Sequence, residues 1–137
     1  MNKSEVREEI FKLIYSLEVQ KCESEDQINI YLENSELSDK EKSKIKEDTI
    51  KIIELEKDLN NEIEKNLKSE WKINRISKIN TTILKIAIFE IIYKKLPYKI
   101  SINEAVELAK KYGEDSSASF VNGILASIVR ENNLAEE

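Results

Sequence analysis

Histidine is absent from this chain of 137 residues, which also has only one cysteine and two glycines. The lack of histidine excludes Ser-His-Asp and Cys-His catalysis and most zinc or iron sites. A single cysteine, Cys22, cannot form an internal disulfide or a thiolate metal cage. Two glycines are too few for a phosphate-binding loop or a dinucleotide fingerprint. We therefore expect no enzymatic activity, no metal and no cofactor.

Long apolar runs are also missing. The longest uncharged stretch, residues 116–129, is too short to span a bilayer. Glu5, Glu8 and Glu9 make the beginning of the chain unlike a secretory signal. Hydrophobic residues still make up 40% of the chain, which is too much for a disordered protein. We expect one cytoplasmic domain, residues 1–137, without membrane contact.

The net charge of −5 is unevenly distributed along the chain. Residues 21–70 hold 9 basic and 15 acidic side chains, whereas residues 71–137 hold 10 basic and 8 acidic ones. An acidic protein is a weak candidate for nucleic-acid binding as a whole. The distribution still leaves room for a local positive face in the first and last parts.

Helical periodicity dominates the sequence. Apolar residues predict a first helix over about residues 4–21. Ser-x-x-Gln or Ser-x-x-Glu capping boxes at Ser24, Ser38 and Ser101 predict three further helix starts. Residues 58–61 (DLNN) can divide the long segment that follows Ser38 into two helices.

The run "ILKIAIFEIIY", residues 83–93, predicts a central buried helix. Its β-branched residues would also suit a strand, but no partner strand or hairpin signal accompanies it. Pro97 should end this element, Gly113 should end the next helix, and Asp115 should cap the last one. The sequence thus predicts an all-α bundle of about seven helices.

Three polar or small residues need a structural explanation. Glu90 on the central helix requires a partner, and we expect backbone N–H groups at the start of the helix near Ser101. Gly123 within a helix is about 1 kcal/mol less favourable than Ala, so we expect another helix backbone to pass close to it. Asn122 should be partly buried, with its amide bonded to a neighbouring helix.

Two features suggest binding surfaces. Tyr15 lies roughly 150° and Phe11 about 115° from the centre of the first helix's apolar stripe, with Arg7 and Lys3 nearer its edge. Exposed aromatic rings beside basic groups suit base stacking, although a second helix covering this flank is the favoured alternative. Residues 93–99 (YKKLPYK) also alternate basic and aromatic groups, where the alternative is a solvated helix end.

The order of these pieces resembles the NusB family of bacterial transcription antitermination factors. The resemblance rests on "REEIFKLIYSL", "ILKIAIFEIIY" and "ISINEAVELAKKYGEDSSASFVNGIL". It covers about residues 71–131 and 3–17, while the middle agrees only in helical pattern and length. Asn103, in the second position of the I-N-E-A-V-E-L-A-K-K motif, is assigned a structural role.

The resemblance implies an all-α fold of two packed helical subdomains, about residues 1–70 and 71–137. It further implies that the protein binds boxA RNA, a short single-stranded signal in ribosomal RNA leader transcripts. Binding would occur together with NusE, a ribosomal small-subunit protein, in an RNA polymerase complex that resists termination. No catalysis is implied.

When the family's motif positions are carried over to this sequence, the implied RNA face consists of residues on the first helix and around the turn before the last helix. The family's arginine-rich beginning is reduced here to "MNKSEVREE", which predicts fewer phosphate contacts and weak RNA affinity without NusE. The NusE surface is expected around residues 73–85. The residues expected on the RNA face are Lys3, Arg7, Lys12, Tyr15, Tyr112, Asp115 and Phe120.

Two other functions fit the same resemblance. A NusB-type adapter could act through protein contacts alone, without RNA binding. An RNA cytosine methyltransferase can carry a NusB-like domain as its RNA-binding module. The sequence shows no nucleotide-binding half beside that domain, so the adapter is the stronger alternative.

Overall fold

The computed structural model describes residues 1–22, 24–68 and 72–134. Within these ranges the chain forms helices and turns and no strand, which confirms the all-α prediction. None of the helices described is both long and apolar enough to cross a membrane. The chain divides into two compact units, Met1–Leu55 and Glu56–Glu137.

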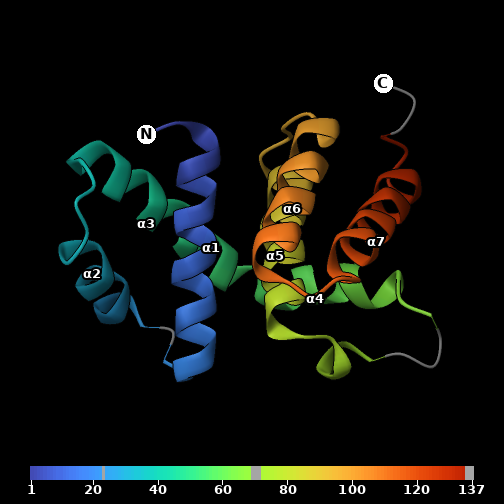
Figure 1. Cartoon of the computed structure of the whole chain (residues 1–137), viewed down its shortest axis with the longest axis horizontal. Helices are drawn as coiled ribbons and strands as arrows, with labels where there is room; N and C mark the ends of the chain where they lie inside the picture. Colours follow the sequence, from blue (N-terminus) through green and yellow to red (C-terminus); the bar gives the residue numbers. More distant parts are fainter. Residues whose placement is uncertain (23, 69–71, 135–137) are drawn as a thin grey trace. The chain divides into compact units, whose positions relative to one another are not determined.

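The first unit holds three helices that contact one another (Figure 1). α1 buries an apolar face that includes Ile10, Leu13 and Leu17, as its periodicity predicts. The N-cap of α2 is Ser24, whose hydroxyl accepts the Gln27 N–H at 3.2 Å, so the predicted start of this helix is confirmed. The three helices are α1 (Lys3–Gln20), α2 (Glu25–Glu33) and α3 (Asp39–Glu54).

The second unit is built around α5, which contacts α4, α6 and α7. Residues 81–88 of α5 are all buried, as expected of a central helix. A π-helical segment, η2, continues α5 directly, so residues 83–93 are helical throughout, as predicted. The elements are α4 (Glu56–Lys65), the 3-10 turn η1 (Ile73–Arg75), α5 (Lys78–Ile88), η2 (Phe89–Tyr93), α6 (Tyr98–Tyr112) and α7 (Ser117–Glu131).

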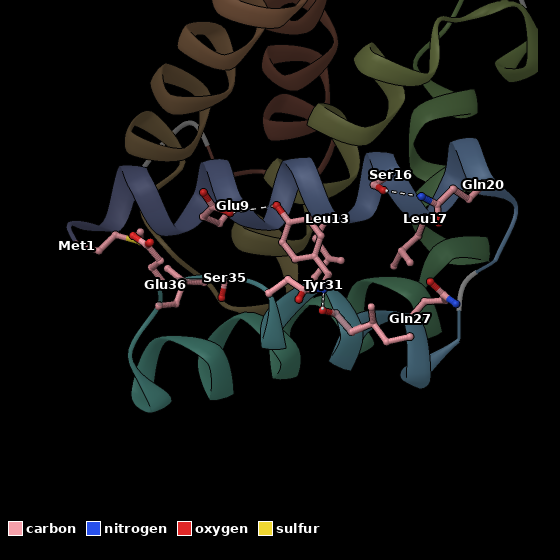
Figure 2. A pocket seen from close by; sticks show the side chains of 13 residues that line it. Met1, Glu9, Leu13, Ser16, Leu17, Gln20, Gln27, Tyr31, Ser35 and Glu36 are labelled. Carbon is pink, nitrogen blue, oxygen red and sulfur yellow. Dashed lines mark hydrogen bonds between the residues drawn. The ribbon is translucent and has the colours of Figure 1, made fainter.

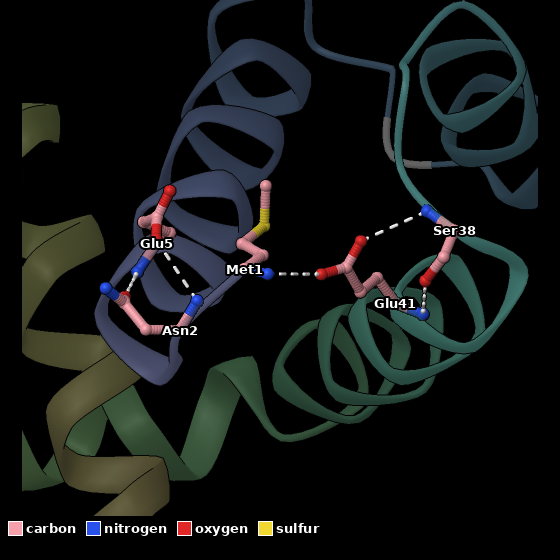
Figure 3. Close-up of polar contacts among 5 residues, drawn as sticks. All are labelled: Met1, Asn2, Glu5, Ser38 and Glu41. Carbon is pink, nitrogen blue, oxygen red and sulfur yellow. Dashed lines mark hydrogen bonds and ion pairs between the residues drawn. The ribbon is translucent and has the colours of Figure 1, made fainter.

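Two helices of the first unit, α1 and α3, begin with capping boxes, in which the side chains and backbone N–H groups of two residues form reciprocal hydrogen bonds (Figure 3). The Ser38 hydroxyl accepts the Glu41 N–H at 3.2 Å, and Glu41 accepts the Ser38 N–H at 3.0 Å, which confirms the predicted capping box. Asn2 and Glu5 form a second box. The amine of Met1 lies 3.3 Å from Glu41 Oε2. The pKa of Glu41 is lowered, first by the Ser38 N–H and further by this amine.

The predicted break at residues 58–61 is wrong. The long segment divides at Leu55, where α3 ends, and residues 58–61 lie inside α4. Leu59 and Ile63 are fully buried one turn apart, and this burial outweighs the weak helix preference of the Asp and Asn residues around them. The two compact units divide between Leu55 and Glu56, before α4.

The predicted start of α6 at Ser101 is also wrong. The helix begins at Tyr98, directly after Pro97, whose φ of −57° already suits a helix. Ser101 is 1% exposed inside α6 and donates its hydroxyl to Glu90 Oε1 at 2.8 Å. Glu90 thus has a partner, as its burial requires, in the side-chain hydroxyl of Ser101.

Replacing Glu90 tests this pairing. We expect Glu90→Leu to lower the free energy of unfolding by about 1 kcal/mol, because the buried Ser101 hydroxyl loses its acceptor. The effect stays small because a serine hydroxyl in a helix can turn to the carbonyl four residues earlier. Glu90→Gln should lose less, and adding Ser101→Ala to Glu90→Leu should recover stability. Urea melts in which the added Ser101→Ala only deepens the loss would contradict the pairing.

The predictions for Asn122 and Gly123 are wrong. α7 buries Val121, Ile124 and Leu125, and at about 100° per residue this face leaves positions 122 and 123 on the other side. Both residues are exposed, and a Cβ added to Gly123 would meet no atom within 4 Å. No helix backbone passes close to Gly123 among the described residues. Asn103 on α6 is exposed as well.

Gly113 ends α6 as predicted, but for a different reason. Its φ of −92° is open to any residue, so no left-handed conformation is involved. A Cβ at Gly113 would lie 2.5 Å from Ser117 Oγ and 2.8 Å from the Ala109 carbonyl oxygen. Asp115 makes no cap: α7 starts at Ser117 without a side-chain cap, and Ser117 Oγ instead accepts the Glu114 N–H at 2.9 Å.

Candidate nucleic-acid interface

Four of the seven predicted RNA-face residues lie on α1. Lys3, Arg7 and Tyr15 share a ridge with Phe11, because residues four apart lie one turn above another on a helix. Lys12 lies one turn before Tyr15 on an adjacent ridge. α1 therefore brings these side chains to neighbouring positions along one helix, as its spacing predicts.

Tyr15 is half-buried and stacks on Phe11, with ring centroids 6.0 Å apart and an interplanar angle of 11°. Phe11 itself is only 2% exposed, so its ring is covered at this position. The buried ring fixes the orientation of the half-exposed one, which reduces the side-chain entropy lost on binding. Phe11 as a support for Tyr15 was missed from the sequence, although the spacing of four residues is a visible signal.

The basic side chains of α1 differ in their availability. Lys3 is exposed, whereas Arg7 is only 9% exposed. Lys12 lies 3.6 Å from Glu9 on the preceding turn, in an exposed pair of the kind that contributes little to stability. Lys3 and Lys12 are thus the α1 cations most accessible to a phosphate.

The other three predicted residues surround the turn between α6 and α7. Tyr112 is the last residue of α6, and the Lys111 ammonium lies 5.5 Å from the centre of its ring. Asp115 is exposed in the turn, and Phe120 is half-buried in the first turns of α7. The three residues supply a carboxylate and two aromatic rings, and Lys111 adds a cation beside them, so this turn can hydrogen-bond and stack with nucleotide bases.

A hollow of about 780 Å³ lies between α1 and α2 (Figure 2). The Tyr31 hydroxyl donates to Glu9 Oε2 across it at 3.1 Å, and the Gln20 amide donates to Ser16 Oγ at 3.3 Å. None of the four RNA-face candidates on α1 lines this hollow. Among the residues that the structure describes, no group of acidic or cysteine side chains is arranged to hold a metal ion.

The model of the NusB family matches residues 4–130. The chain belongs to the NusB family. Among curated NusB proteins, the transcription antitermination protein NusB of Ruminiclostridium cellulolyticum is 43% identical over 129 residues, which cover 93% of this chain and 88% of the relative. That of Acetivibrio thermocellus is 40% identical over 131 residues, covering 95% and 90%.

Solved NusB structures share the fold of this family member. NusB of T. maritima is 28% identical and superimposes with a TM-score of 0.86 over 100% of this chain and 99% of its own. A crystal structure of the antitermination factors NusB and NusE with double-stranded RNA contains a chain that is 20% identical. It aligns with a TM-score of 0.83 over 94% and 96% of the two chains, a likeness that concerns the fold.

Proposed function

We propose that this NusB-family chain is a transcription antitermination factor that binds boxA-type single-stranded RNA together with NusE. It joins an RNA polymerase antitermination complex that supports ribosomal RNA transcription in the bacterial cytoplasm. Relatives with 43% and 40% identity are transcription antitermination proteins. A protein of the same fold assembles with NusE and RNA.

The proposal of RNA binding rests on the stacked rings of Phe11 and Tyr15 on α1. Tyr15 presents a half-exposed ring whose orientation is fixed by the buried Phe11 ring. Base stacking on such a ring needs an unpaired base, because the faces of bases within a duplex are already occupied. The proposed ligand is therefore a single strand, even though the NusB–NusE crystal structure contains double-stranded RNA.

The remaining contacts are assigned by residue type. Lys3, Arg7 and Lys12 supply positive charge to the phosphates, while Tyr112, Asp115 and Phe120 form the second part of the RNA face. Residues 73–85 are proposed to contact NusE. This segment holds η1 and the start of α5, and exposed polar side chains in it include Asn74, Arg75 and Lys78.

One observation favours the adapter alternative. Arg7 is nearly buried, and Lys12 lies close to Glu9, which leaves Lys3 as the one fully exposed and unpaired cation of the four α1 candidates. Few phosphate contacts give weak RNA binding with a shallow salt dependence. An adapter would bind NusE but would leave RNA to other proteins.

A mobility-shift titration with boxA RNA, with and without NusE, separates these functions. We expect weak binding by the chain alone and binding at least about tenfold tighter with NusE, because each partner raises the local concentration of the other. A scrambled single strand and a boxA duplex are the controls, and both should bind less tightly. A NusE complex that never shifts boxA RNA would support the adapter and overturn the proposal.

A further inference from the structure

A second hollow, of about 670 Å³, lies in the second unit where η2, the loop to α6 and the residues after α7 come together. Among the described residues that line it, those of the floor are aliphatic, those of the rim are basic, and Tyr98 is the one aromatic residue. We call it the basic hollow. Its floor is formed by Ile91, Ile92, Leu96 and Leu134, and its rim carries Lys95, Tyr98 and Lys99.

Among the described residues that line the basic hollow, no carboxylate balances its charge. The hollow between α1 and α2, in contrast, is lined by Glu9 and Glu36. Lys95 and Lys99 are exposed and form no ion pair with any residue described. Lysines elsewhere in the same unit do pair, as Lys65 does with two carboxylates. The hollow therefore presents two available cations beside an apolar floor.

The walls of the basic hollow are held by backbone hydrogen bonds. The Leu96 N–H donates to the Glu90 carbonyl at 2.9 Å, and the Leu134 N–H donates to the Val129 carbonyl at 3.0 Å. Lys95 lies in the left-handed region with φ of 55°, a conformation that is unfavourable for lysine and is kept by its surroundings. A hollow that is already formed loses little entropy when a ligand enters it.

We propose that the basic hollow docks an acidic peptide segment of another protein. A large apolar side chain of the segment enters the floor at Leu96 and Leu134, and flanking carboxylates lie against Lys95 and Lys99. The contact is separate from the RNA face and does not depend on the proposed antitermination function.

The residue types in the lining favour a peptide over single-stranded RNA as the ligand. Single-strand sites stack successive bases on aromatic rings or arginine planes, whereas the described residues of this lining include one tyrosine and no arginine. Its floor is made of branched aliphatic side chains, which accept leucine or phenylalanine side chains well. The two lysines match carboxylates at either end of such an anchor.

Fluorescence anisotropy with a rhodamine-labelled peptide, Asp-Glu-Leu-Phe-Asp-Glu, tests the proposal on the full chain. We expect saturable binding that weakens about tenfold in Lys95→Glu/Lys99→Glu, because two attractive pairs become repulsive. The matched control is Lys57→Glu/Lys72→Glu, which changes the same charge at exposed sites of the same unit and should change affinity less than about twofold. Leu96→Ala should weaken binding without any change in charge. Circular-dichroism melts establish that each variant is folded.

Four results would overturn the proposal. Equal weakening by both charge-reversal pairs would show non-specific attraction. Equal binding of an Asn-Gln-Leu-Phe-Asn-Gln peptide, or no binding of the acidic peptide at about 1 mM, would show that carboxylates are not recognised. Finally, a single-stranded RNA whose binding is lost in Lys95→Glu/Lys99→Glu, while the peptide fails to compete, would assign the hollow to nucleic acid.

Discussion

A Gly113→Ala variant is expected to unfold at a lower urea concentration than the parent protein, whereas Gly123→Ala is expected to unfold at a higher one. The new Cβ at position 113 would lie 2.5 Å from Ser117 Oγ and 2.8 Å from the Ala109 carbonyl oxygen. Ser117 is 2% exposed and already accepts the Glu114 N–H, so it has little room to move. Overpacking of this kind typically lowers stability by about 1–3 kcal/mol.

At Gly123 the same substitution has the opposite sign. The position is exposed inside α7, and an added Cβ meets nothing within 4 Å. Alanine is favoured over glycine in a helix interior by about 1 kcal/mol, so the variant should gain up to that amount. The two variants should therefore differ by about 1–4 kcal/mol in urea melts. Similar losses at both positions would mean that Gly123 packs against a neighbour after all.

A Tyr15→Ala variant is expected to weaken RNA binding by about 1–3 kcal/mol, the usual range for one stacked base. Tyr15→Phe keeps the ring on Phe11 and should bind nearly as tightly as the parent protein. The alanine variant should also lose about 1 kcal/mol of stability, because the contact with the Phe11 ring disappears. Affinity is therefore measured well below the midpoint of thermal unfolding.

Lys3→Ala should act on the same complex through charge. Removal of the Lys3 charge should make the slope of log affinity against log salt shallower by about the contribution of one phosphate contact. Tyr15→Ala should leave that slope unchanged. Lys51→Ala, at an exposed position on α3, is the matched control and should do neither. If Tyr15→Ala bound RNA normally and lost several kcal/mol of stability, Tyr15 would be a packing residue and would not belong to the RNA face.

Much of the fold follows from local signals. The buried face of α1, the start of α2 at Ser24, the capping box at Ser38 and the buried helix over residues 83–93 were all predicted from spacing and residue type. Each depends on interactions within a few residues of the chain, which the sequence displays directly.

Packing between distant segments explains where prediction failed. The break between α3 and α4 follows the burial of Leu59 and Ile63, which outweighs the local preference of their polar neighbours. Gly123 was assigned a close contact because glycine is unfavourable in a helix, but residue type alone does not reveal whether a neighbour is present. The sequence indicates a basic and aromatic segment at residues 93–99. It does not show that Leu134, much later in the chain, lines the same hollow.

The most direct test of the RNA face is an NMR titration of the isotope-labelled chain with a single-stranded boxA oligonucleotide. We expect the backbone amide signals that shift to cluster around Lys3 to Tyr15 on α1 and around residues 112–120. Signals of the basic hollow, residues 91–99 and 132–134, should remain in place. Shifts confined to the hollow, or no saturable shifts with boxA RNA even when NusE is present, would contradict the account.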